Sequence, residues 1–384
     1  MNRLAGPVTI RRIAIASLFF VHGGVLGSWV VHIPTVQQRL AIGEGTLGLA
    51  LLGTSLGAIL AMPFAGGATG KLGSKPVAGI ASLAYCLVLP ALLLLPSTWA
   101  LAGGLLVLGA SGGCQNVAMN AQAVALGRRY ESPIMSSFHA LFSIGGLVGS
   151  GGGGLMLRAG LGPEAHLLGA AALLVGVTGL AYPALLPPRV DAEPDERPMF
   201  RWPDRALWGL GLLAFLTLLA EGAMSDWSAV YLRRALETSP AMASTGYAAF
   251  STAMAAGRLG GDRVADRIGR TRLVRWGSTV AAAGLGGAVL LHRPWAAVAG
   301  FATMGIGLAN VIPILFGAAG RQGAGSSGSG IAAVTTTGYI GLLSGPPLIG
   351  WASEWAGLPL GMGLVAASVG LVAGLTVLVS PDGR

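Results

Sequence analysis

The chain has 384 residues, of which 53% are hydrophobic and only 10% are charged, and its mean hydropathy is +0.70. Soluble globular proteins carry roughly a quarter charged residues, so this composition excludes a water-soluble fold. The net charge of +9 does not indicate nucleic-acid binding, because the basic residues form short clusters between apolar runs. We therefore expect an integral membrane protein whose main partner is the lipid bilayer.

A helix needs about 20 predominantly apolar residues to cross a bilayer. The first half of the chain contains six such runs, near residues 13–33, 45–66, 76–96, 98–126, 134–157 and 165–187. The second half contains six more, near residues 206–232, 241–260, 272–292, 294–319, 327–350 and 357–379. The sequence thus predicts an all-α membrane protein with twelve transmembrane helices.

The basic residues indicate how these helices are oriented, because cytoplasmic loops carry an excess of Lys and Arg. If the N-terminus is inside, most of the 24 basic residues, Arg258 included, are assigned to the cytoplasmic side. The residues left on the outside are Arg39, Arg158, Arg233, Arg234 and Arg293. This bias predicts that both termini lie in the cytoplasm.

The chain divides into two related halves. Residues 188–205 are rich in proline and mixed charge, which predicts a cytoplasmic linker between a six-helix half at 1–187 and another at 206–384. Gly73 and Gly145 recur about 196 residues later as Gly269 and Gly341, in matching spans. Such a repeat predicts two pseudo-symmetric six-helix halves with a solute site between them.

The loop after the eighth span, residues 261–272, has the sequence GDRVADRIGRTR and resembles the G-x-x-x-D-R-x-G-R signature of the major facilitator superfamily (MFS). The corresponding first-half loop has Gly70 where that family usually has Asp. Residues 221–227, 116–120 and 137–140 resemble a poorly characterised bacterial branch near the fucose permeases. The resemblance implies the MFS fold and a multi-pass protein of the bacterial inner membrane.

The signature loop implies a conformational latch, in which Asp266 approaches the positive end of the fifth helix and an arginine reaches Glu131. A solvated loop that only sets topology is the alternative. The residues assigned to this gating motif are Gly261, Asp266, Arg267, Gly269, Arg270 and Glu131.

Ionisable residues inside the bilayer are costly unless they are paired or neutralised, so they are candidates for proton coupling. Glu221 lies roughly 21 Å and Asp226 roughly 29 Å into the seventh span. Asp226 can instead pair with Arg233 near the outer rim, and Glu221 can form a structural hydrogen bond. His22, in the first span, either faces Glu221 or packs between helices.

Polar and aromatic residues in other spans are candidates for lining a solute cavity. Asn116 and Asn120 share one helix face, and packing between helices is the alternative for such amides. The aromatic side chains can stack on a sugar-like ring or anchor the helices at the membrane surface. The full set is Asn116, Asn120, His139, Trp29, Trp227 and Asn310.

The leading interpretation is a secondary active transporter that moves a small polar, sugar-like solute with protons, by symport and alternating access. An exporter of amphipathic drugs or metabolites is the alternative within this class. A membrane-embedded enzyme is disfavoured, because the five His, two Cys and two buried acids form no cluster by spacing. A channel is also disfavoured, because the sequence contains no repeated filter motif and no rings of like charge. We expect a monomer with no cofactor and no metal.

Overall fold

The computed structural model describes residues 5–128, 134–188, 207–322 and 327–379. Within these ranges the chain folds into helices and contains no strand. The expected all-α fold is therefore confirmed for the part of the chain that the structure describes.

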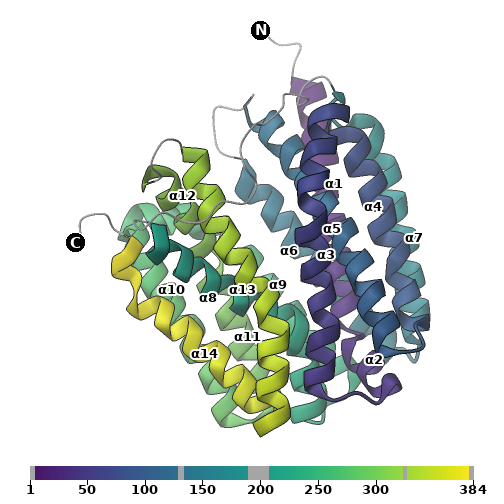
Figure 1. Cartoon of the computed structure of the whole chain (residues 1–384), viewed down its shortest axis with the longest axis vertical. Helices are drawn as coiled ribbons and strands as arrows, with labels where there is room; N and C mark the ends of the chain where they lie inside the picture. Colours follow the sequence, from purple (N-terminus) through teal and green to yellow (C-terminus); the bar gives the residue numbers. More distant parts are fainter. Residues whose placement is uncertain (1–4, 129–133, 189–206, 323–326, 380–384) are drawn as a thin grey trace. The chain divides into compact units, whose positions relative to one another are not determined.

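The helices of the first half follow the expected spans closely (Figure 1). The stretch that contains the expected first span, Thr9–Leu40, is two helices, because Pro34 removes a hydrogen bond that would continue the first helix past Val30. The helices are α1 (Ala5–Val30), α2 (Ile33–Leu40), α3 (Glu44–Leu72), α4 (Ser74–Ala91), α5 (Thr98–Gly127), α6 (Met135–Arg158) and α7 (Pro163–Ala181).

The second half repeats this pattern. The expected tenth span is also two helices, and here Pro313 interrupts the helix four residues earlier, at Ala309. The helices are α8 (Trp208–Val230), α9 (Pro240–Ile268), α10 (Arg270–Leu291), α11 (Pro294–Leu308), α12 (Val311–Gln322), α13 (Ser327–Ala356) and α14 (Leu358–Gly374).

Nine helical stretches in the described ranges are long and apolar enough to cross a membrane, judged by length and composition. The other expected spans correspond to α9, α13 and the 17-residue α14. The helix pattern thus agrees with the expected twelve-span membrane fold.

The helices sort into two compact units by their contacts. Unit 1 comprises Met1–His32 and Gly53–Asp195, and unit 2 comprises Ile33–Leu52 and Glu196–Arg384. The sequence places residues 33–52 in the first half, whereas their contacts place α2 and the start of α3 in unit 2. The division at residues 187 and 206 stays a prediction, and nearly all of the expected linker lies outside the described residues.

Glycines let helix backbones approach closely inside unit 1. A Cβ on Gly27 of α1 would collide with the backbone of Gly146 on α6, and one on Gly145 would collide with the carbonyl of Phe20. Small residues at such crossings are typical of membrane helices. The tight α1–α6 crossing fixes the side chains of α1 relative to their neighbours.

The start of α3 packs on α13 within unit 2. A Cβ on Gly48 would lie 2.5 Å from the carbonyl oxygen of Pro346. The carboxylate of Glu354 lies so close to Gly45, in the first turn of α3, that a Cβ there would collide with it. The positive end of the helix dipole stabilises a carboxylate at this position. These contacts explain why residues 33–52 group with unit 2.

Candidate functional site

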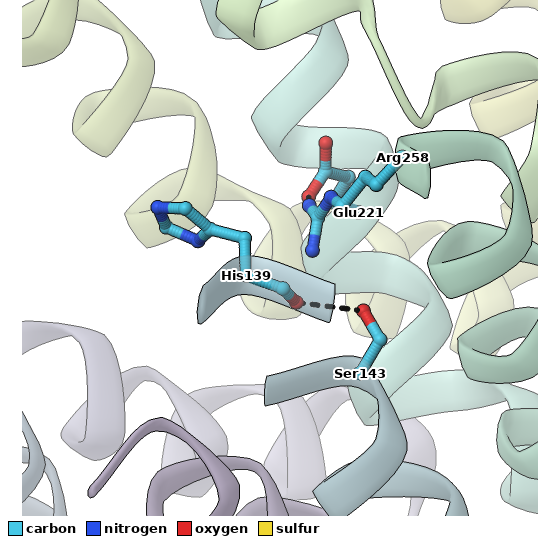
Figure 2. A network of polar contacts seen from close by, with 4 residues as sticks. All are labelled: His139, Ser143, Glu221 and Arg258. Carbon is cyan, nitrogen blue, oxygen red and sulfur yellow. Dashed lines mark hydrogen bonds and ion pairs between the residues drawn. The ribbon is translucent and has the colours of Figure 1, made fainter. Parts of the chain in front are cut away.

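An ion pair lies inside unit 2, between Glu221 on α8 and Arg258 on α9. The Nη2 atom of Arg258 is 3.9 Å from Oε2 of Glu221, and the two side chains are 14% and 20% exposed, respectively. Figure 2 shows these charged groups next to each other. Glu221 lies about 20 Å along α8 from Trp208. A charged pair at this depth is costly to bury and is a candidate functional group.

Polar residues on α9 line up with this pair. Tyr247, Ser251 and Arg258 share one face of the helix, because spacings of four and eleven residues return nearly to the same direction. Tyr247 forms a hydrogen bond with Ser251 on this face. Arg258 thus shares one polar face of α9 with Tyr247 and Ser251.

Arg258 is the main residue that the sequence interpretation missed. It was assigned to the cytoplasmic side, but it lies ten residues before the end of α9 and faces Glu221. The sequence indicates this position only through the helical register, because Arg258 lies on the same helix face as Tyr247 and Ser251. The expected partner of Asp226, Arg233, instead donates a hydrogen bond to the carbonyl of Thr238 at 2.8 Å.

His22 lies in a second polar group, inside unit 1. Its Nδ1 atom is 3.0 Å from Oε1 of Gln115 on α5, and Nε2 of that amide donates to the carbonyl of Leu18 at 3.2 Å. The imidazole also packs on the rings of Tyr85 and Phe142, at centroid distances of 5.1 and 5.6 Å. His22 lies in unit 1 and Glu221 lies in unit 2, and the expected approach of the two side chains stays a prediction.

The expected cavity residues of unit 1 occupy different environments. Nδ2 of Asn120 donates to the backbone carbonyl of Asn116 at 2.8 Å and to its side-chain Oδ1 at 3.3 Å, so the two amides interact along one helix face. The His139 ring lies edge-on to Phe19, and the His139 carbonyl accepts a 3.4 Å hydrogen bond from Ser143 (Figure 2). All three candidate side chains are partly exposed.

The two tryptophans are buried in helix packing. Trp29 is 3% exposed and Trp227 is fully buried. The Trp227 ring packs toward Gly350 on α13. In this conformation neither indole offers a free face to a solute, so stacking on a sugar-like ring requires another conformation.

Asn310 contacts the gating motif, and its expected place in a solute cavity stays a prediction. Its Nδ2 atom donates to the carbonyl of Gly257 at 3.0 Å. A Cβ on Gly261 would collide with the Asn310 amide, which explains why the first position of the motif is glycine. Asn310 also lines a cavity of about 190 Å³ together with Asp266 and Arg270. The amide thus packs against the end of α9, and the expected loop at 261–272 is helical except at Gly269.

The sharp turn between α9 and α10 also depends on the motif. Gly269 has φ +85°, and Gly73, at the equivalent turn between α3 and α4, has φ +82°. Only glycine adopts this backbone conformation without strain. The shared geometry supports the internal repeat. Arg267 lies in the last turn of α9, and Glu131, the expected latch partner, lies outside the described residues.

No group of three or more His, Cys, Asp or Glu side chains that could hold a metal occurs among the described residues. The polar features are instead an ion pair, a histidine–amide pair and a basic motif at the α9–α10 turn, all carried by helices of membrane length. A bundle of apolar helices with such groups in its interior defines a multi-pass membrane transporter.

The sequence matches the Major Facilitator Superfamily over residues 15–346, and the chain belongs to this family. An uncharacterized MFS-type transporter of Yersinia pestis is 38% identical to it, over 94% of this chain and 93% of the relative. The membrane protein MosC of Rhizobium meliloti is 33% identical, over 90% and 84% respectively. The chain is therefore a membrane transporter and not an enzyme.

Two solved structures share the fold. A mutant of the nucleoside transporter NupG has a TM-score of 0.70 at 15% identity, over 96% of this chain and 97% of that chain. The human organic anion transporter MFSD10 has a TM-score of 0.68 at 16% identity, over 95% and 99%. The expected branch near the fucose permeases is not confirmed by these relatives and stays a prediction.

Proposed function

We propose that this protein is a proton-coupled secondary transporter, which moves a small polar, sugar-like solute across the bacterial inner membrane by alternating access. The observation that carries the proposal is the Glu221–Arg258 pair inside a bundle of membrane-length helices. A carboxylate at this depth is the group in the chain best placed to bind and release a proton during transport.

The geometry of the pair suits a reversible contact. Strong charge-assisted pairs have N–O distances of about 2.7–2.9 Å and are often bidentate, whereas here the charged atoms are 3.9 Å apart. Protonation of Glu221 would cancel its attraction to Arg258, and deprotonation would restore it. The pair therefore offers two states that differ by one proton, which is what coupling requires.

The related transporters are compatible with this proposal but do not fix the solute. The protein of Yersinia pestis is described only as an MFS-type transporter. The two structural neighbours are named for nucleosides and for organic anions. We place the solute among small polar compounds because the interior contains amide, imidazole and hydroxyl groups.

The test is solute uptake into proteoliposomes under an imposed pH gradient, with a panel of sugars, sugar acids, nucleosides and lipophilic cations. Glu221→Gln keeps the shape of the side chain and fixes it in a neutral form. We expect this variant to retain exchange of solute without a gradient and to lose proton-driven accumulation. Asp226→Asn, on the same helix but nearer the outer rim, should have a milder effect on accumulation.

Three results would contradict the proposal. Accumulation by Glu221→Gln with a proton current like the parent's would make Glu221 a structural residue. Transport limited to lipophilic cations would favour an exporter of amphipathic compounds. Flux of many solutes without saturation would indicate a channel.

A further inference from the structure

The hydrogen bonds around His22 fix where its proton lies. Nε2 of Gln115 donates to the Leu18 carbonyl, so the amide oxygen is the end that faces the imidazole. An amide oxygen can only accept, and the Nδ1 atom of His22 must therefore carry the hydrogen. Gln115 is fully buried, which makes this orientation costly to reverse.

The other ring nitrogen of His22 is then a hydrogen-bond acceptor. In the neutral imidazole, Nε2 has a lone pair and no hydrogen when Nδ1 is protonated. Among the described residues, the contacts of His22 are those with Gln115, Tyr85 and Phe142, and none of them reaches Nε2. The His22 side chain is not fully buried, so Nε2 is the end of the ring that remains open to a further hydrogen bond.

An accessible acceptor in a membrane-spanning helix needs a polar environment, because lipid cannot donate a hydrogen bond to it. The His22 side chain is only partly exposed, and two aromatic rings hold the imidazole plane in place. A ligand for this position must offer an O–H or N–H donor. A carboxylate group and a quaternary cation have no such donor.

We infer that His22 is a solute-binding residue, whose Nε2 atom accepts a hydrogen bond from a hydroxyl or N–H group of a neutral solute, with Gln115 as the residue that positions it. The inference rests on the proposed transport function and names the chemistry that the site selects. Hydroxyl-rich rings such as hexoses and nucleosides fit it, and lipophilic cations do not.

The experiment measures ligand binding to the purified full-length protein in detergent at about pH 8, where an ordinary imidazole is neutral. The probes are D-glucose and uridine, each compared with a derivative methylated at every hydroxyl and, for uridine, also at N3, together with tetraphenylphosphonium. O-methylation keeps the ring and its acceptors but removes the hydroxyl donors. We expect glucose or uridine to bind, and its methylated derivative to bind about tenfold more weakly.

Two variants at position 22 separate the roles of the ring nitrogens. The amide nitrogen of His22→Asn occupies the place of Nδ1 and keeps the bond to Gln115, but nothing remains at Nε2. We expect its affinity for the bound probe to fall about tenfold, while the free protein stays folded with a somewhat lower unfolding temperature because the ring packing is lost. His22→Gln, whose amide oxygen reaches toward the place of Nε2, should retain part of the affinity.

The matched control is His292→Asn, the same substitution at an exposed residue in the left-handed conformation that Asn tolerates. It should bind like the parent. The inference would be overturned if His22→Asn bound the probe as tightly as the parent protein, or if a methylated derivative bound as tightly as the unmethylated compound. Binding of tetraphenylphosphonium, or binding of none of the probes, would also overturn it. The assay uses no gradient, so failed proton coupling and failed recognition by His22 give separate results.

Discussion

Neutralising one member of the Glu221–Arg258 pair should destabilise the protein more than neutralising both. Two unit charges 3.9 Å apart attract each other by about 4 kcal/mol at an effective dielectric constant near 20. Removing one partner of a fully buried pair costs about 3–5 kcal/mol, because the other charge stays unpaired. Since both side chains are partly exposed, we expect about 2–3 kcal/mol for Glu221→Gln or Arg258→Gln alone.

The assay is a double-mutant cycle, with thermal unfolding of the purified protein in detergent as the measurement. The two single variants should unfold at clearly lower temperatures than the parent. The double variant, which has no unpaired charge, should recover much of the loss, with a coupling free energy of about 1–3 kcal/mol. The double variant also provides a folded protein without a titratable Glu221 for uptake measurements.

Strictly additive effects of the two single changes would refute this reasoning, because they would mean that the two groups do not interact. Parent-like stability of both single variants would also refute it, since water would then solvate each charge fully. Either result would remove the ion pair as the basis for coupling.

Three further changes test other parts of the fold. Asp266→Asn should lower transport while membrane expression persists, because the latch loses its charge; equal damage from Gly70→Ala would show that these loops serve folding alone. Gly48→Ala should lower the unfolding temperature, because its Cβ would press on the α13 backbone at a cost of about 1–3 kcal/mol; unchanged unfolding would contradict this close packing. Gln122→Leu should lower the free energy of unfolding in denaturant by about 2–4 kcal/mol, because it breaks buried hydrogen bonds to Ser74 and to both backbone groups of Leu186. Gln38→Leu, at an exposed position, is the control, and a similar loss of stability there would contradict this explanation.

The helices could be predicted because a membrane span requires a long apolar run, and each run ends at charge, glycine or proline. The break at Ala309, inside the expected tenth span, was not predicted, because counting apolar residues ignores where a proline ring interrupts a helix. The signal was present in Pro313, which lies four residues after Ala309. Proline alone does not decide the outcome, since Pro63 lies inside α3 and Pro346 lies inside α13.

The candidate site was harder to predict than the spans. Glu221 was found because an acid inside an apolar run is rare, but its partner depends on how α8 and α9 face each other. Similarly, His22 was a candidate from its position alone, whereas its partner Gln115 lies 93 residues away and is one of several polar residues in its span. Sequence periodicity gives the face of each helix but not which faces meet.

The grouping of residues 33–52 with unit 2 has a consequence for dividing the gene. A chain cut within the expected linker yields a C-terminal fragment that lacks α2 and the start of α3, and with them the helix end that Glu354 contacts. The complementary fragment carries that segment without its packing partners. Each fragment alone would expose surfaces that the intact chain buries, so functional expression would require both fragments to be synthesised together in the same membrane.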